Sequence, residues 1–164
     1  MLFRSQGSTF TLTACLAKTA ARPAPAEATS PAAPVRTARK RLLLAEDDEI
    51  NREVALELLG DYPELSIDVA ENGALAVERA SAGRYDLILM DIEMPVLDGI
   101  AATRAIRQLP GHAATPIVAM TANAFAEDKA RCLDAGMSDF IAKPVDPDLL
   151  FAMLDRWLND QESA

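Results

Sequence analysis

The sequence predicts a doubly wound α/β domain, in which helices cover both faces of a parallel five-stranded sheet. Three observations support this prediction. Short apolar segments alternate with longer segments of helical periodicity five times between residues 41 and 158. Most of the short segments are apolar throughout, which is typical of strands buried on both faces. The five units together have the length of one ordinary domain.

Five segments are predicted as strands: residues 42–45, 65–69, 87–90, 116–120 and 139–141. The first, third and fourth are continuous apolar runs, whereas the second, LSIDV, alternates between apolar and polar residues. The fifth, DFI, is the shortest. Connections between parallel strands are right-handed, which leaves few possible topologies for such a chain.

Five segments of helical periodicity follow these strands: residues 50–59, 73–82, 100–108, 124–135 and 146–158. In the first, Ile50, Val54 and Leu58 recur at i, i+4 and i+8, as on one face of a helix. The fourth is followed by Gly136, a residue type that favours the left-handed backbone just after a helix. The last carries an apolar face along its whole length.

Charge divides the chain near residue 41. Residues 1–41 hold seven Lys or Arg and one acid, a net charge of +6, whereas residues 42–164 carry a net charge of −15. We therefore expect a tail over residues 1–19, an extended Ala/Pro-rich linker over 20–38 and a folded domain over 39–160. The acidic domain argues against nucleic-acid binding, and its carboxylates favour a hard cation.

The two cysteines, Cys15 and Cys132, predict neither a disulfide framework nor a zinc site, because zinc needs more Cys or His at close spacing. A reducing, cytoplasmic setting is expected. The sequence has no apolar run long enough for a membrane span, and its N-terminal stretch is too polar for a secretion signal.

Polar side chains follow four of the predicted strands. Glu46 and Asp47 follow the first strand, Asp91 the third, Thr121 the fourth and Lys143 the fifth. In the flavodoxin-like strand order 2-1-3-4-5 these ends converge at one edge of the sheet. Carboxylates that close together favour Mg²⁺, and a central carboxylate can attack phosphorus while a hydroxyl and an ammonium hold the phosphoryl oxygens.

These motifs resemble the CheY-like receiver domain of two-component response regulators over residues 41–158. The resemblance rests on the acidic pair, on Asp91 in DIEMP followed by DG, on Thr121 in MTANAF and on Lys143 in KP. It implies that Asp91 is the phosphoacceptor of a phosphorelay. It further implies that Glu46, Asp47, Asp91 and the backbone carbonyl of Glu93 bind Mg²⁺.

The same resemblance implies a phosphorylation-dependent switch. Thr121, the backbone of Ala122 and Lys143 are expected to contact the phosphoryl group, and the bond between Lys143 and Pro144 is expected to be cis. Thr121 would move inward and Phe140 would rotate into the vacated space. The surface of the fourth helix, fifth strand and fifth helix would then change, as a population shift between two packings. The alternative for Phe140 is a partly buried aromatic residue of the fifth strand without a switching role.

Partners follow from this resemblance as well. The expected phosphodonor is a histidine kinase or a histidine phosphotransfer protein, the downstream protein is unspecified, and the chain is expected to be a monomer or weak dimer. No enzymatic activity is expected beyond self-catalysed phosphotransfer and dephosphorylation. Two alternatives are a pseudo-receiver that is never phosphorylated and a small phosphatase, whose nucleophile and second acid would be Asp91 and Glu93.

Residues 7–13 (GSTFTLT) resemble the last strand of the ATP-binding domain of hybrid histidine kinases. With the linker and receiver that follow, they suggest the C-terminal piece of a hybrid kinase or a gene descended from one, although chance similarity remains an alternative for so short a match. Among other residues, Asp48 adds a carboxylate where kinase-linked receivers often carry Asn. His112, in a Pro-Gly-His turn, is expected to be solvated, and Cys132 to lie near the core.

Overall fold

The computed structural model describes residues 39–122 and 126–159, except for the side chains of 126–128. The predicted tail (1–19), the linker (20–38) and the strand-like residues 7–13 lie outside this part of the chain. The strands are β1 (Lys40–Ala45), β2 (Leu65–Ala70), β3 (Leu87–Asp91), β4 (Ile117–Thr121) and β5 (Asp139–Ala142). They form one parallel sheet in the order β2-β1-β3-β4-β5, which confirms the predicted fold class and strand order.

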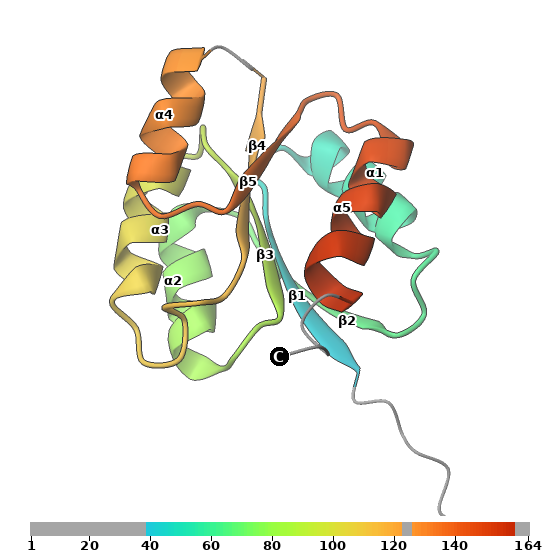
Figure 1. The fold of residues 1–164 in the computed structure, drawn as a ribbon, viewed down its shortest axis with the longest axis horizontal. Coiled ribbons are helices and arrows are strands. Elements are labelled where there is room, and N and C mark those ends of the chain that lie inside the picture. The colour runs from blue at the N-terminus through green and yellow to red at the C-terminus, as the bar shows by residue number, and fades with distance from the viewer. Residues whose placement is uncertain (1–38, 123–125, 160–164) are drawn as a thin grey trace, which may run out of the picture. The chain divides into compact units, whose positions relative to one another are not determined.

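The five helices cover the two faces of this sheet. They are α1 (Glu49–Leu59), α2 (Gly73–Ala82), α3 (Gly99–Arg107), α4 (Ala126–Asp134) and α5 (Pro147–Asn159). Helices α2, α3 and α4 lie on one face, and α1 and α5 lie on the other (Figure 1). The predicted elements are therefore confirmed with boundaries that differ by one or two residues.

Strand β3 illustrates why the core has two halves. All five of its side chains are buried, and successive ones point to opposite faces. Ile88 and Met90 belong to the apolar cluster beneath α2, α3 and α4, whereas Leu87 and Leu89 belong to the cluster beneath α1 and α5. Each such side chain contributes about 2 kcal/mol by leaving water, which favours apolar residues along a strand that is buried on both faces. Only the last residue of β3, Asp91, is charged.

Side-chain caps fix where three helices begin. Asp48, Asn72 and Asp98 each accept a hydrogen bond from the backbone N–H three residues later, at the start of α1, α2 and α3 respectively. The exposed Asp48 carboxylate is therefore used to cap α1. At the end of α4, Gly136 has a φ of +96°, which agrees with the glycine predicted after this helix.

The prediction for His112 was wrong, because this side chain is buried. Its Nε2 lies 2.8 Å from the carbonyl oxygen of Ala80 and 3.1 Å from that of Gly83, and Thr115 Oγ1 lies 3.2 Å from its Nδ1. A ring whose Nε2–H donates to these carbonyls satisfies acceptors at the end of α2 that have no partner within the helix. The histidine thus acts as a cap supplied by a distant loop. Cys132 is buried, as expected.

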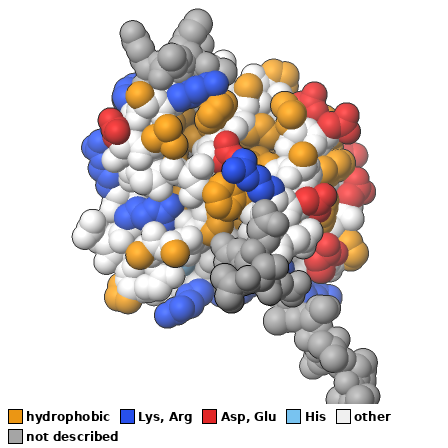
Figure 2. Space-filling view, viewed as in Figure 1, with side chains coloured by type: hydrophobic (Ala, Val, Ile, Leu, Met, Phe, Trp, Pro, Cys, Tyr) orange, Lys and Arg blue, Asp and Glu red, His pale blue; other side chains and the backbone are white. Residues whose placement is uncertain are grey.

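Charged side chains are unevenly distributed over the domain. In the face shown in Figure 2, most acidic side chains gather on the side that carries α1 and α5, and basic side chains are more frequent on the opposite side. Helix α1 accounts for part of this pattern, since it exposes Glu49, Glu53 and Glu57 in successive turns. A partner that binds this side therefore meets negative charge.

Candidate functional site

The predicted site residues meet at one edge of the sheet. Glu46 follows β1, Asp91 and Thr121 are the last residues of β3 and β4, and Lys143 follows β5. Because the strands are parallel and in register, their carboxyl ends reach the same level, and the order β2-β1-β3-β4-β5 brings four of them side by side.

Lys143 links two buried carboxylates. Its Nζ lies 2.6 Å from Asp91 Oδ2 and 2.7 Å from Glu46 Oε2. Both carboxylates are almost fully buried, with 4% of Asp91 and 1% of Glu46 exposed. Asp91 Oδ1 also accepts a hydrogen bond from the backbone N–H of Glu93, at 3.1 Å. One ammonium group is thus shared between two buried anions.

A third carboxylate completes an acidic cluster. One oxygen from each of Glu46, Asp47 and Asp91 lies within 4.8 Å of the other two, and Asp47 is exposed to solvent. Three converging carboxylate oxygens with one open side suit a hard divalent cation such as Mg²⁺, which keeps several waters. The exposed Asp47 leaves one side of the cluster open for those waters.

Burial and charge shift the pKa values at this site. Burial, together with the Glu46 carboxylate, raises the pKa of Asp91 to about 6, although hydrogen bonds from Lys143 and Glu93 oppose the shift. Burial alone would lower the pKa of Lys143, but its bonds to Asp91 and Glu46 raise it above the usual value. The cluster therefore carries more negative charge than Lys143 neutralises.

The loop after Asp91 is held against helix α3. The N–H of Gly99 donates to the carbonyl oxygen of Ile92 at 3.0 Å. A Cβ atom on Gly99 would overlap the backbone carbonyl oxygen of Asp91. Val96 has a φ of 69°, which strains a β-branched residue. The start of α3 therefore lies so close to the backbone of Asp91 that position 99 has no space for a side chain.

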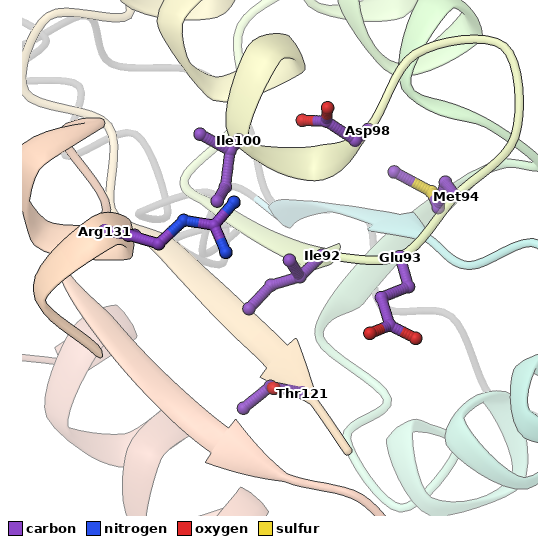
Figure 3. Close-up of a pocket in the computed structure, with 7 residues that line it drawn as sticks. All are labelled: Ile92, Glu93, Met94, Asp98, Ile100, Thr121 and Arg131. Atoms are coloured by element: carbon purple, nitrogen blue, oxygen red, sulfur yellow. The ribbon is translucent and has the colours of Figure 1, made fainter. Parts of the chain in front are cut away.

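A cleft opens between this loop and α4. It is lined by Ile92, Glu93, Met94, Asp98, Ile100, Thr121 and Arg131 (Figure 3). Thr121 lies at one end of the cleft, and the Arg131 guanidinium points into it from α4. The exposed Ala122 follows Thr121 at the end of β4. The Thr121 hydroxyl is thus close to open space on the α4 side of the sheet.

Phe140 lies on the same side of the sheet, one strand away. It is half-buried, pairs in register with Ala119 and packs against the cluster beneath α2, α3 and α4. Lys129 of α4 places its Nζ 3.9 Å from the centre of the ring, a cation–π contact. The peptide bond between Lys143 and Pro144 is cis.

Two residues near the acidic cluster were missed by the sequence analysis. Asn51 Nδ2 donates to Glu46 Oε1 at 3.3 Å, and Arg52 Nη1 donates to the backbone carbonyl of Glu46 at 3.2 Å. Both lie in the first turn of α1, from which a side chain reaches back to the preceding loop. Their signal in the sequence is two adjacent polar residues just after the acidic run, in the first turn of the predicted helix.

Residues 42–155 match the response regulator receiver domain family. The chain therefore belongs to this family. Among curated relatives, hybrid signal transduction histidine kinase B of Dictyostelium discoideum is 42% identical in an alignment of 132 positions that covers 73% of this chain. The chain spans only a small part of such relatives: 7% of this kinase, and 12% of the histidine kinase BarA of Escherichia coli.

Solved receiver domains have the same fold. One of them is the receiver domain of sensor histidine kinase PA1611 from Pseudomonas aeruginosa, which has a magnesium ion in its active-site cleft. It is 41% identical with a TM-score of 0.68, and the match covers 73% of this chain and 98% of that chain. The receiver domain of Saccharomyces cerevisiae Ssk1, in complex with the histidine phosphotransfer protein Ypd1, is 32% identical with a TM-score of 0.65, covering 73% and 88%.

Within residues 39–122 and 126–159, every helix is too short or too polar to cross a bilayer.

Replacing Lys143 with methionine is expected to destabilise the domain. Glu46 and Asp91 would lose their shared cation while remaining buried, which costs on the order of 3 kcal/mol. Urea unfolding in EDTA at pH 7 measures this loss, and millimolar Mg²⁺ should recover part of it by supplying charge to the same carboxylates. Lys40→Met, at the far end of the sheet, is the control. Equal stability of the two variants would contradict the expectation.

Proposed function

We propose that this receiver domain accepts a phosphoryl group from a phosphohistidine onto Asp91. The observation that carries the proposal is the environment of Asp91. Its carboxylate is buried, has a raised pKa, forms an ion pair with Lys143 and lies close to the carboxylates of Glu46 and Asp47. Membership of the receiver family supports it. A structural role for the cluster is less favourable, because three converging carboxylates repel one another.

The transfer forms one bond and breaks one. An oxygen of the Asp91 carboxylate attacks phosphorus, an O–P bond forms, and the P–N bond of the phosphohistidine breaks. The electron pair stays on the nitrogen, which leaves as neutral imidazole when the other ring nitrogen carries a proton. Lys143 remains beside the acceptor and pairs with a phosphoryl oxygen, while Thr121 and the backbone of Ala122 donate hydrogen bonds to the others.

Mg²⁺ fits the acidic cluster of this site. Glu46, Asp47, Asp91 and the backbone carbonyl of Glu93 would hold the ion, and the magnesium-bound receiver domain of PA1611 supports this assignment. When bound, Mg²⁺ offsets the charge of the carboxylates and of the incoming phosphoryl oxygens. The buried Glu46 carboxylate is held in place by Lys143 and Asn51. Lys143 also contacts the acceptor Asp91, so the positions of the two carboxylates are linked.

The phosphodonor is proposed to dock on α1 beside the site. Ile50 and Val54 are exposed there, at 72% and 47%, although both are apolar. Val54 also lines a small cavity with Lys143 and Val145, so the apolar surface continues to the acidic cluster. A helix that carries a phosphohistidine next to apolar and basic side chains would fit this surface. The complex of Ssk1 with Ypd1 supports a donor of this kind.

Ile50→Glu is expected to weaken phosphotransfer from a histidine phosphotransfer protein about tenfold, because one apolar contact is replaced by a charge. Phosphorylation by acetyl phosphate should stay unchanged, since that small donor needs no docking surface. Initial rates with each donor measure the two effects. Leu133→Glu, at a leucine of α4 that is 58% exposed, is the control, and an equal loss with both donors would contradict a docking role.

The output of the domain is proposed to be a change of the α4–β5–α5 surface. Thr121 would turn toward the phosphoryl group, and Phe140 would move inward beside it. The cation–π contact from Lys129 favours the position that the ring has in this structure and would be given up in this movement. Beside Phe140, an apolar groove between β5 and α5 is lined by Ile141, Leu149 and Met153 among others, and it would change shape.

Mass spectrometry after incubation with a phosphorylated histidine phosphotransfer protein tests the proposed function. The expected result is one phosphoryl group on Asp91 that is released by hydroxylamine and does not form in EDTA. We further propose that the chain is not a turnover enzyme, so phosphomonoesters should not be hydrolysed in multiple turnovers. Labelling of Asp98 or another carboxylate, or no labelling, would refute the phosphoacceptor role. Multiple turnover would favour the phosphatase alternative.

A further inference from the structure

Arg52 reaches back from α1 to the backbone that carries the acidic pair. Its Nη1 lies 3.2 Å from the carbonyl oxygen of Glu46 and 3.4 Å from that of Asp47. Only 17% of its side chain is exposed, although it is an arginine at the edge of the domain. One guanidinium nitrogen thus contacts both peptide groups that follow β1.

Two further contacts hold the same segment. Nη2 of Arg52 lies 4.0 Å from a carboxylate oxygen of Glu71, which follows β2, so the guanidinium connects two loops at the site edge. The neighbouring Asn51 donates to the Glu46 carboxylate at 3.3 Å. The start of α1 therefore holds both the backbone and one side chain of the acidic pair.

We propose that Arg52 is a positioning residue, whose guanidinium fixes the backbone of Glu46 and Asp47 so that their carboxylates converge on a bound divalent cation. This inference rests on the proposed function only in taking that cation to be Mg²⁺. Mg²⁺ demands nearly ideal octahedral geometry, so a small rotation of the peptide group between the two acids would move their oxygens out of place. Contacts outside the ligand shell commonly set metal affinity in this way.

Charge alone predicts the opposite effect of removing Arg52. A guanidinium next to a cation site repels the cation, so a purely electrostatic role means that loss of the arginine tightens Mg²⁺ binding. A positioning role means that the same loss weakens it. Lysine separates the two further, because it keeps the charge but lacks the planar fork that lets Nη1 contact the two carbonyl oxygens while Nη2 faces Glu71.

The test compares Arg52→Met and Arg52→Lys with the wild type by calorimetric titration of Mg²⁺ into the full chain. The control is Arg104→Met, which removes an exposed charge from α3. We expect both Arg52 variants to bind Mg²⁺ three- to tenfold more weakly, and Arg104→Met to stay within twofold of the wild type. Urea unfolding in EDTA shows that each variant is folded at the titration temperature.

The outcomes distinguish this inference from the proposed function. Tighter binding by Arg52→Met, or wild-type affinity in both Arg52 variants, would overturn the positioning role while leaving the phosphoacceptor assignment intact. Absence of Mg²⁺ binding and of Asp91 phosphorylation in the wild type would overturn both. Weaker binding by Arg52→Lys with near-normal unfolding would support positioning, because the variant keeps the charge and the fold.

Discussion

Replacing Asp91 with asparagine is expected to abolish phosphorylation and, at the same time, to make the domain more stable at neutral pH. The amide is not a nucleophile toward phosphorus, so labelling by a phosphohistidine donor should fall by at least about 100-fold. The stability gain follows because the substitution removes one of three converging carboxylates while keeping an oxygen that accepts from Lys143. The two effects have opposite signs, because the same carboxylate is the nucleophile and a buried negative charge next to two others.

The stability gain should depend on pH in a defined direction. The pKa of Asp91 is about 6 in the folded domain and near 3.8 in the unfolded chain. A raised pKa means that this group contributes fully below about pH 4 and loses its contribution as the pH rises through 6. Asp91→Asn should therefore exceed the wild type by on the order of 2 kcal/mol at pH 7, and this advantage should vanish toward pH 4.

Urea unfolding of both proteins in EDTA between pH 4 and 7.5 measures this difference. Titrating groups away from the site act on both proteins alike and cancel in the comparison, so the difference reports Asp91 together with the neighbours that contact it. A free-energy difference that is constant over this range would show that Asp91 is not held at a raised pKa. Saturating Mg²⁺ should reduce the difference at pH 7, because the ion stabilises the wild-type carboxylates.

Gly99→Ala is expected to disrupt the site through the backbone. The added Cβ would overlap the carbonyl oxygen of Asp91, and the next atoms in its way are backbone atoms of Asp91 and Ile92. Neither can move without displacing the end of β3. We expect a loss of about 3 kcal/mol in the free energy of unfolding. Phosphorylation of the folded fraction should fall by a further large factor, since a shift of about 1 Å can cost 100-fold in rate.

Gly60→Ala provides the matched control. Gly60 ends α1 with an ordinary helical φ of −62°, and its nearest obstacle is the carbonyl oxygen of Glu57, 3.1 Å from the added atom. Its substitution should change stability by less than about 1 kcal/mol. Unfolding midpoints measure the stability of the two variants, and labelling by acetyl phosphate measures their phosphorylation. Similar values for both would mean that α3 can move away from Asp91 without consequence.

The fold was predictable because its signals are local. The run LILM in β3 is apolar throughout, which is the pattern expected of a strand that is buried on both faces of a sheet. The site was predictable for a related reason: Asp91, Thr121 and Lys143 each stand where a strand ends, so strand order alone brings them together. The roles assigned to individual site residues stay predictions until phosphorylation is measured.

The failures concern contacts that depend on tertiary structure. His112 follows Pro and Gly, which favours a solvated turn, but its burial is decided by carbonyls at the end of α2, some thirty residues earlier. In the sequence, Arg52 is one more charged residue on a surface helix. Its contacts with the backbone carbonyls of Glu46 and Asp47, in the loop before α1, are visible only in the structure. Hydrophobic periodicity indicates which face of a helix or strand a residue occupies. It does not indicate which distant groups a long side chain contacts.

The direction of the strands also determines how this domain can be joined to others. All five strands run toward the edge that holds Asp91, and α5 runs back, so residues 39 and 159 both lie near the opposite edge (Figure 1). A neighbouring domain, a linker or a fluorescent reporter fused at either of these residues would be attached away from the acidic cluster. The domain can thus be tethered at one edge of the sheet while the edge that holds the acidic cluster stays open to an incoming partner.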